Sequence, residues 1–173
     1  IKNHIYNNGN KNSIYEHNTY TSAQGLVYQF NRFGPLREGC LGNNLKDRSA
    51  GLVVRYNWIE DGNRQLDLVD YAGFADLDSY HKTHVYGNVL VEHDGEGNNQ
   101  IIHYGGDSSN RDGYRKGTIY LYHNTVVSYR SGNTTLIRLS SPGETAECYN
   151  NIFHTPAPGP HFAITNQEGT VKL

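Results

Sequence analysis

The 173-residue sequence has no methionine, only two cysteines, and little of the alanine and glutamate that long helices favour. It also lacks any apolar run near the ~20 residues of a membrane-spanning helix, so no contact with a membrane is expected. Glycine and asparagine are plentiful, and 14 tyrosines and 5 phenylalanines can contribute to a core. Composition therefore favours an all-β domain rich in turns over a helical or disordered chain.

Charge is scarce as well: 18% of the residues are charged, and the net charge is −2. No basic stripe of the kind that binds nucleic acid is present, so nucleic acid is not an expected partner. Cys40 and Cys148 are too few for a disulfide framework, and we expect two free thiols. Ile1–Ile5 and Gly169–Leu173 both have the character of strands, so we expect a fragment of a longer β-structure with both ends cut.

One short motif recurs along the chain: an asparagine, any residue, then an apolar residue. Its spacings are 28, 26, 31, 36 and 27 residues, and its asparagines are Asn3, Asn31, Asn57, Asn88, Asn124 and Asn151. A β-rich run comes before most of them, at Gly25–Phe30, Gly51–Tyr56, Thr83–Gly87, Gly117–Tyr122 and Thr145–Tyr149. Another run follows each motif after a loop, at Ser13–Glu16, Asn44–Asp47, Gln65–Val69, Gln100–Tyr104, Thr135–Leu139 and His161–Thr165.

A repeat of this length is too short to bury a face alone and must stack on its neighbours. The pattern predicts an all-β, right-handed parallel β-helix, a solenoid of about five to six coils that forms one domain over residues 1–173. A β-propeller would need four-stranded blades of ~40–45 residues, and a β-sandwich would not keep the asparagine register. We expect the asparagines to stack as a corner ladder, because asparagine tolerates the left-handed backbone and its amide can bond the next coil.

Loops of unequal length separate these runs. The longest are 34–43, 70–82 and 105–116, and insertions in a solenoid usually fall on one face, often the binding face. Pro156–Pro160 is interpreted as a rigid turn within one coil.

Alignment of the second runs separates two faces, because side chains alternate along a strand. The positions expected to point inward hold Leu45, Leu66, Ile102 and Ile137. The next position points outward, and along the stack it holds Tyr15, Lys46, Asp67, His103 and Arg138. Two residues further on, the same face carries His17, Arg48, Val69, Gly105 and Ser140. Asp47 falls at an inward or edge position, which predicts a buried, hydrogen-bonded structural carboxylate.

Neighbouring coils lie ~4.8 Å apart, so the outward column is expected to form an exposed strip of titratable groups. Charges at that spacing interact by roughly a few kcal/mol, enough for Lys46, Asp67 and His103 to perturb one another's protonation. Such an arrangement is typical of general acid–base catalysis. The alternative is a solvated face of paired charges, Lys46 with Asp67 for instance. The other histidines show no spacing typical of a metal site, and the sequence assigns no metal ligands.

The asparagine corners and the run Gly42–Ser49 resemble the pectate-lyase-like right-handed parallel β-helix proteins of bacteria. Within that superfamily, the stretch from Lys46 to Asp70 is similar to the alginate lyase and chondroitinase B family. This resemblance implies a lysine base, which Lys46 matches, and an arginine one coil further on. It also implies that a calcium ion often neutralises the uronate carboxylate, and that the protein is secreted or periplasmic.

The sequence departs from that family's pattern at the arginine. Asp67, with Val69 beside it, stands at the expected place, and the nearest cations are Arg48 and Arg64. No cluster of asparagine and glutamate suggests a set of calcium ligands.

We therefore expect a protein that acts on polysaccharides, as a lyase that cleaves an acidic, uronate-containing glycan by β-elimination. This reaction needs a base, a cation that neutralises the carboxylate, and an acid for the leaving oxygen. The expected base is Lys46 or His103, the cation Arg48 or Arg138, and the proton donor Tyr15 or His17. The expected substrate-binding residues are Tyr15, His17, Asp67, Asp70 and Asp107.

Two alternatives remain at this point. A glycoside hydrolase would need a pair of carboxylates, for which Asp67 with Asp70 or Asp107 is available. A non-catalytic β-helix would be either a glycan-binding module or a structural rod.

Overall fold

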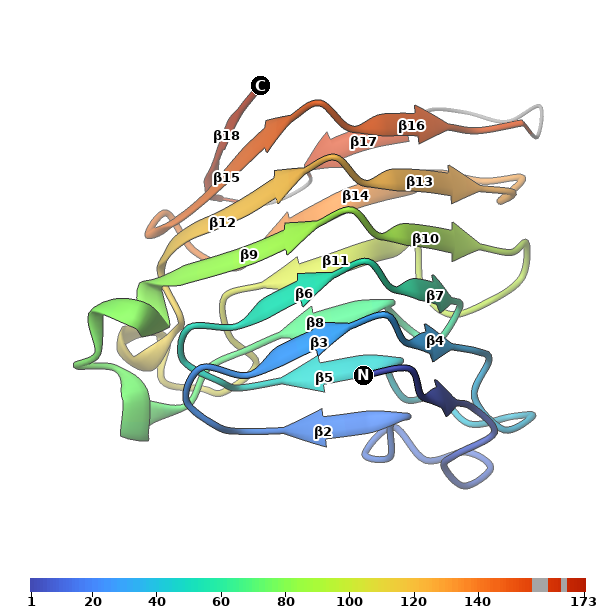
Figure 1. Ribbon diagram of the computed structural model, residues 1–173, viewed down its shortest axis with the longest axis horizontal. Coiled ribbons are helices and arrows are strands. Elements are labelled where there is room, and N and C mark those ends of the chain that lie inside the picture. Colours follow the sequence, from blue (N-terminus) through green and yellow to red (C-terminus); the bar gives the residue numbers. More distant parts are fainter. Residues whose placement is uncertain (157–161, 166–167) are drawn as a thin grey trace.

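The chain winds as a right-handed solenoid, and each coil adds one strand to each of three parallel sheets (Figure 1). The computed structural model describes residues 1–156, 162–165 and 168–173. In Figure 1 the colours pass from blue at the first coil to red at the last, so the order of the sequence is also the order of stacking. The fold is the all-β right-handed parallel β-helix that the repeat predicts.

Each sheet contains six of the described strands. The first sheet follows the asparagine corners and consists of β1 (His4–Ile5), β4 (Arg32–Phe33), β7 (Trp58–Glu60), β10 (Val89–Glu92), β13 (Thr125–Ser128) and β16 (Ile152–His154). The second sheet consists of β2 (Thr19–Thr21), β5 (Leu45–Asp47), β8 (Leu66–Leu68), β11 (Gln100–Tyr104), β14 (Thr134–Leu139) and β17 (Phe162–Thr165). The third sheet consists of β3 (Val27–Gln29), β6 (Val53–Arg55), β9 (Lys82–Tyr86), β12 (Gly117–Tyr122), β15 (Glu144–Tyr149) and β18 (Thr170–Lys172). Short 3-10 helices lie in the loops, at η1 (Ala72–Phe74), η2 (Asp78–His81) and η3 (Arg111–Gly113).

The corner asparagines form one continuous ladder, as predicted. Each donates its side-chain amide to Oδ1 of the asparagine one coil further on, at 3.0–3.1 Å, in the pairs Asn3–Asn31, Asn31–Asn57, Asn57–Asn88, Asn88–Asn124 and Asn124–Asn151. The same oxygen also accepts the backbone N–H of the preceding asparagine. The ladder therefore satisfies backbone groups that the corner would otherwise leave buried and unpaired.

The left-handed backbone at each corner falls on the residue before the asparagine, not on the asparagine as expected. The backbone angle φ is positive at Lys2, Phe30, Tyr56, Gly87, His123 and Asn150. Only one of these is a glycine, so the other corners hold a residue whose left-handed conformation costs about 1–3 kcal/mol. The ladder bonds offset this cost, because they hold the next residue in one orientation.

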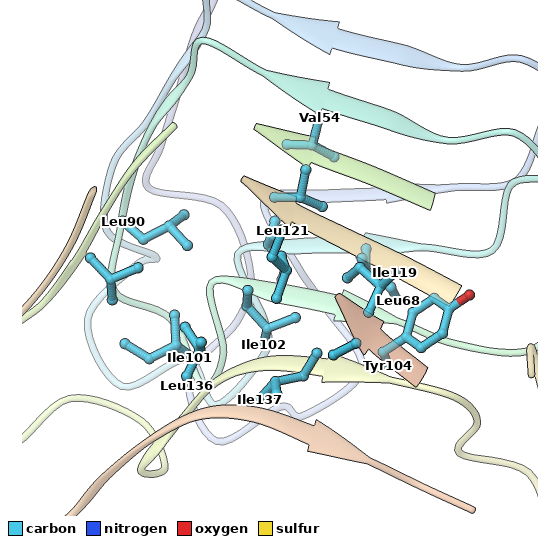
Figure 2. Close-up of a cluster of buried hydrophobic side chains, with 14 of the residues drawn as sticks. Val54, Leu68, Leu90, Ile101, Ile102, Tyr104, Ile119, Leu121, Leu136 and Ile137 are labelled. Atoms are coloured by element: carbon cyan, nitrogen blue, oxygen red, sulfur yellow. The ribbon is translucent and has the colours of Figure 1, made fainter. Parts of the chain in front are cut away.

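Inward-facing rows from all three sheets fill the interior (Figure 2). The predicted row on the second sheet is confirmed, since the members pair from coil to coil and have no exposed surface: Leu45, Leu66, Ile102 and Ile137. Val54 and Leu121 of the third sheet and Leu90 of the first sheet belong to the same cluster (Figure 2). Each coil thus packs its apolar side chains on its neighbours as well as across the interior.

The first coil departs from the prediction. Ser13–Glu16 forms turns rather than a strand, and the second-sheet strand of this coil is β2, Thr19–Thr21. The Glu16 carboxylate accepts hydrogen bonds from the backbone and side-chain amides of Asn10, at 2.6 and 2.8 Å, and so closes this segment into a loop. Tyr15, predicted to lie in the outward column, is consequently 81% exposed on that loop.

A buried arginine fixes the loop 105–116 to the interior. Arg115 has no exposed surface, and its guanidinium donates to the backbone carbonyls of Ser49 at 2.9 Å and Val69 at 3.2 Å. It lies 3.6 Å from the carboxylate of Asp47, which also accepts the Thr21 hydroxyl at 2.7 Å. Asp47 is therefore the buried structural carboxylate that the sequence predicts.

Two smaller predictions concern the cysteines and the proline-rich turn. Cys40 and Cys148 are free thiols, as expected. The turn predicted at Pro156–Pro160 lies, apart from its first residue, outside the described residues, and so does His161.

The first testable prediction concerns the inward row. Replacing Leu66 with alanine should lower the free energy of unfolding by about 2–5 kcal/mol, because the fixed spacing of the coils prevents the cavity from closing. Ile152→Ala, at a side chain that is 62% exposed, is the control and should cost less than about 1 kcal/mol. Urea unfolding measures both, and equal losses would contradict the assigned register.

The second prediction concerns the ladder. Asn88→Ala should cost about 2–4 kcal/mol, because it leaves the Asn57 backbone N–H without its partner and removes one donor from the Val54 carbonyl. Asn3→Ala, at the first rung, removes only the side-chain donor to Asn31, because the backbone N–H of residue 3 stays, and should cost about 1 kcal/mol or less. A similar loss of stability in the two variants would show that the ladder does not satisfy the corner backbone.

Candidate functional site

A pocket of about 830 Å³ lies against the outer face of the second sheet, between the turns of the first coil and the loop 105–116. It is lined by Ile14, Tyr15, His17, Tyr20, Leu41, Asn43, Lys46, Arg48, Asn63, Arg64, Asp67, His103, Gly106, Asp107, Tyr114 and Arg138. The predicted site residues that line it are Tyr15, His17, Lys46, Arg48, Asp67, His103, Asp107 and Arg138. Asp70 does not line the pocket, but it supports the loop wall behind it.

Strand register builds the floor of this pocket. The paired outward positions are Tyr20, Lys46, Asp67, His103 and Arg138, in that order along the stack. The column is therefore the predicted one, except that Tyr20 takes the place assigned to Tyr15. Lys46 follows Tyr20 by 26 residues, the same spacing as between Asn31 and Asn57, and that spacing is the signal that identifies Tyr20 from sequence.

The expectation of an exposed strip is wrong. Lys46 is 8% exposed, Asp67 2% and His103 3%, whereas Tyr20 at the end of the column is 55% exposed. The side chains of the loops and of neighbouring coils cover the middle of the column. Each charged group there also bonds the one above or below it. The pocket thus exposes the ends of a buried polar network rather than a row of solvated charges.

Asp67 is the centre of that network. Its carboxylate accepts the Lys46 ammonium at 2.6 Å, the Asn43 amide at 2.8 Å and the His103 ring at 2.7 Å. Burial alone would raise the pKa of the Asp67 carboxyl, but the bond from His103 and the charge of Lys46 hold it well below its usual range. Asp67 is therefore the permanent counter-ion of Lys46.

His103 is held at both ring nitrogens. Nδ1 lies 2.7 Å from Asp67 and Nε2 lies 2.7 Å from the hydroxyl of Ser140. Burial lowers the pKa of His103, so the ring is neutral, with Nδ1–H donating to Asp67 and Nε2 accepting from Ser140. The order carboxylate, imidazole, hydroxyl is that of a serine hydrolase triad. Ser140, however, is 8% exposed and does not line the pocket, so the contact orients the ring rather than presenting a nucleophile.

The charged groups of Lys46 and Arg48 both contact the carboxylate of Asp107. Lys46 Nζ lies 2.6 Å from Asp107 Oδ2, and Arg48 donates to Asp107 Oδ1 at 3.0 Å. Burial lowers the pKa of the Lys46 ammonium, but Asp67 and Asp107 outweigh it and the pKa is raised. Arg48 Nε also donates to the Tyr20 hydroxyl at 2.7 Å. Lys46 is consequently a fixed cation, and Arg48 connects it to the exposed tyrosine.

His17 is a neutral hydrogen-bond donor at the pocket wall. Its Nδ1 accepts the backbone N–H of Asn43 at 2.8 Å, so the proton of the neutral ring sits on Nε2. Burial, followed by the charge of Lys46, lowers the pKa of His17 to about 4. The ring therefore stays uncharged near neutral pH and offers an N–H to a ligand.

Two further arginines complete the lining. Arg64 donates to the side chain of Gln100 at 2.8 Å and lies 3.8 Å from Asp67. Arg138 Nε is buried and has no hydrogen-bond partner among the described residues. Lysine and arginine contribute four cations to the lining and aspartate two anions, so the pocket carries net positive charge in a chain whose net charge is −2.

Metal ligation was the remaining possibility for this site. Within the described ranges, no group of three or more histidine, cysteine, aspartate or glutamate side chains is arranged to hold a metal ion. In the same part of the chain, no helix is long and apolar enough to cross a membrane.

Comparison with known proteins adds no family to this picture. No protein-family model, no curated protein and no solved structure matches the chain.

The third prediction tests the network. Asp67→Asn should cost about 3 kcal/mol near neutral pH, because it leaves Lys46 with one carboxylate instead of two in a buried site. A carboxyl whose pKa is depressed by folding stabilises the protein above its unfolded value and loses that contribution as the pH falls. The stability gap to the unmutated protein should thus stay constant above about pH 5 and narrow below the ordinary value of 3.8.

Urea unfolding at a series of pH values measures this gap. Asp112→Asn, which removes an exposed carboxylate from the loop 105–116, is the control and should change stability by less than about 0.5 kcal/mol. A gap that is equally wide at pH 3 and pH 7 would contradict the assigned role of Asp67.

Proposed function

We propose that this β-helix binds an acidic glycan in the pocket and cleaves it as a lyase, by β-elimination next to a uronate carboxylate. The observation that carries the proposal is the positive pocket, in which Arg138 has a buried guanidinium nitrogen with no partner among the described residues. An unpaired buried donor is costly, and an anionic ligand would satisfy it. A polymer that contains uronate residues carries carboxylates at regular intervals, and these follow the stacked coils when the polymer lies along the solenoid.

Lys46 and Arg48 take the role of the neutralising cations. Binding the uronate carboxylate between them stabilises the negative charge that develops when the neighbouring C–H bond is broken. The raised pKa of Lys46 keeps it protonated, which suits this role better than that of the base the resemblance implies. His103, the other expected base, has both ring nitrogens engaged.

Tyr20 is the group best placed to move the proton. It is half exposed at the pocket, and its oxygen accepts from Arg48 Nε, so the phenolate that is left when its proton passes to solvent lies against a guanidinium. As phenolate, Tyr20 takes the proton from the carbon next to the carboxylate, and the C–H electron pair becomes a C=C bond. The glycosidic C–O bond breaks on the other carbon, and the leaving oxygen takes the proton from the tyrosine. The Nε2–H of His17 donates a hydrogen bond to the bound sugar.

The hydrolase alternative fits the carboxylates less well. A general acid needs a raised pKa, yet the pKa of Asp67 and of Asp107 is lowered, against the effect of burial, by hydrogen bonds and nearby charges. Both also bond the same Lys46 ammonium at 2.6 Å. A glycan-binding module without catalysis uses the same pocket, and the assay below separates it from the lyase.

The fourth prediction is that alginate, pectate or a glycosaminoglycan yields unsaturated uronate products, followed by their ultraviolet absorbance. Tyr20→Phe should lower turnover by about 10²–10⁴-fold, the worth of general acid–base catalysis, with little change in melting temperature. Tyr149→Phe, at a tyrosine of the third sheet that is 45% exposed, is the matched control and should keep full activity.

Parallel assays with added calcium and with EDTA test the metal that the family resemblance implies. Full activity of Tyr20→Phe would contradict the role of this tyrosine. Binding of an acidic glycan without any unsaturated product would favour the non-catalytic module. We expect the protein to be secreted or periplasmic whether it is a lyase or a binding module.

A further inference from the structure

Asp107 lies in the pocket where the charged groups of Lys46 and Arg48 converge. Lys46 Nζ holds its Oδ2 at 2.6 Å, while Arg48 reaches Oδ1 at 3.0 Å and Oδ2 at 3.3 Å. Both carboxylate oxygens are therefore engaged. Two-point binding of this kind is how proteins recognise the carboxylate of a ligand.

The two carboxylates on Lys46 differ in how firmly they are held. The side chain of Asp67 is 2% exposed and has partners in both neighbouring coils, whereas that of Asp107 is 36% exposed and, among the described residues, bonds Lys46 and Arg48 alone. The backbone N–H of Asp107 donates to Asp70 at 2.8 Å, which anchors the loop independently of the carboxylate. The Asp107 side chain can thus turn toward solvent while its backbone stays in place.

We propose that Asp107 is an internal stand-in for the substrate carboxylate, and that a uronate displaces it from Lys46 and Arg48. This inference rests on the acidic glycan of the proposed function and names the carboxylate subsite within it. Asp67 remains as the counter-ion of Lys46, so the displacement exchanges one carboxylate for another without leaving a buried charge unpaired.

The stand-in sets selectivity as well as affinity. A ligand binds only to the fraction of molecules in which Asp107 has left, which weakens its apparent affinity by that fraction. A neutral sugar gains nothing at Lys46 and Arg48 to compensate for the displacement. A uronate restores both ion pairs, so the pocket discriminates between acidic and neutral residues of a polymer.

The test measures binding by isothermal titration calorimetry with short oligomers of guluronate, mannuronate, galacturonate and hyaluronan. The oligomer bound best by the unmutated protein is then compared with its fully methyl-esterified form and with a neutral oligomer carrying sulfate esters. Asp107→Asn removes the competing charge. Asp112→Asn removes the same charge from an exposed site on the same loop and is the matched control.

Asp107→Asn should bind the uronate about tenfold more tightly than the unmutated protein, since the internal competitor is gone. Asp112→Asn should change the affinity less than about twofold, because exposed charges are screened. The methyl-esterified oligomer should bind Asp107→Asn no more tightly than it binds the unmutated protein. A gain as large for the sulfated oligomer would overturn the proposal in favour of general anion attraction, and unchanged or weaker uronate binding by Asp107→Asn would overturn it outright.

A second measurement does not depend on how the variant folds. A crystal structure of the unmutated protein with the bound uronate should show the ligand carboxylate on Lys46 and Arg48, with Asp107 turned away. Asp107 still on both cations would overturn the proposal. Tighter binding by Asp107→Asn without any cleavage would remove the lyase but keep the stand-in, whereas cleavage with unchanged binding would do the reverse.

Discussion

Parallel stacking in register is the constraint on which the rest of this molecule depends. Each residue of a coil lies directly over its equivalent, ~4.8 Å away, so a choice made at one position is repeated along the stack. Asparagine stacks on asparagine at the corner, and leucine or isoleucine on leucine in the interior. The same rule places Lys46, Asp67 and His103 in contact on the outer face. The pocket chemistry is thus a consequence of register.

Stacking of charges is possible only where successive groups complement one another. Along the column a cation, an anion and a neutral imidazole follow one another, and each lies within hydrogen-bond distance of the next. Asp67 can serve both neighbours because a carboxylate has two oxygens and directs one to each coil. Arg115 and Asp47 repeat this solution in the interior, where the loop 105–116 is fixed to several coils at once. Loop placement and column charge are therefore coupled.

How far the sequence predicts this structure depends on the range of the interaction. The inward row and the ladder are visible because a repeated apolar or asparagine position marks each coil. The prediction is wrong in the first coil because the sequence around Ile14 and Tyr15 resembles that of a strand. The Asn10–Glu16 hydrogen bonds that close the turn leave no periodic pattern in the sequence. Lys46 and Asp107 are 61 residues apart and meet only after the loop 105–116 is placed, which no local pattern specifies. Burial of the column follows from that placement, and so no pattern in the sequence predicts it.

Stability alone gives no reason for such a column. Replacing a buried ion pair with well-packed apolar groups is often neutral or stabilising, and a ladder of uncharged side chains was available to this fold, as its corner shows. The reading of Lys46 and Asp67 as a solvated surface pair is also unsupported, since their side chains are 10% and 2% exposed. Charges kept in a costly place beside a pocket, with one lining guanidinium nitrogen that has no partner among the described residues, fit the proposed site for an anionic ligand. On the proposed function, the column is a cost to folding that binding of the glycan would offset.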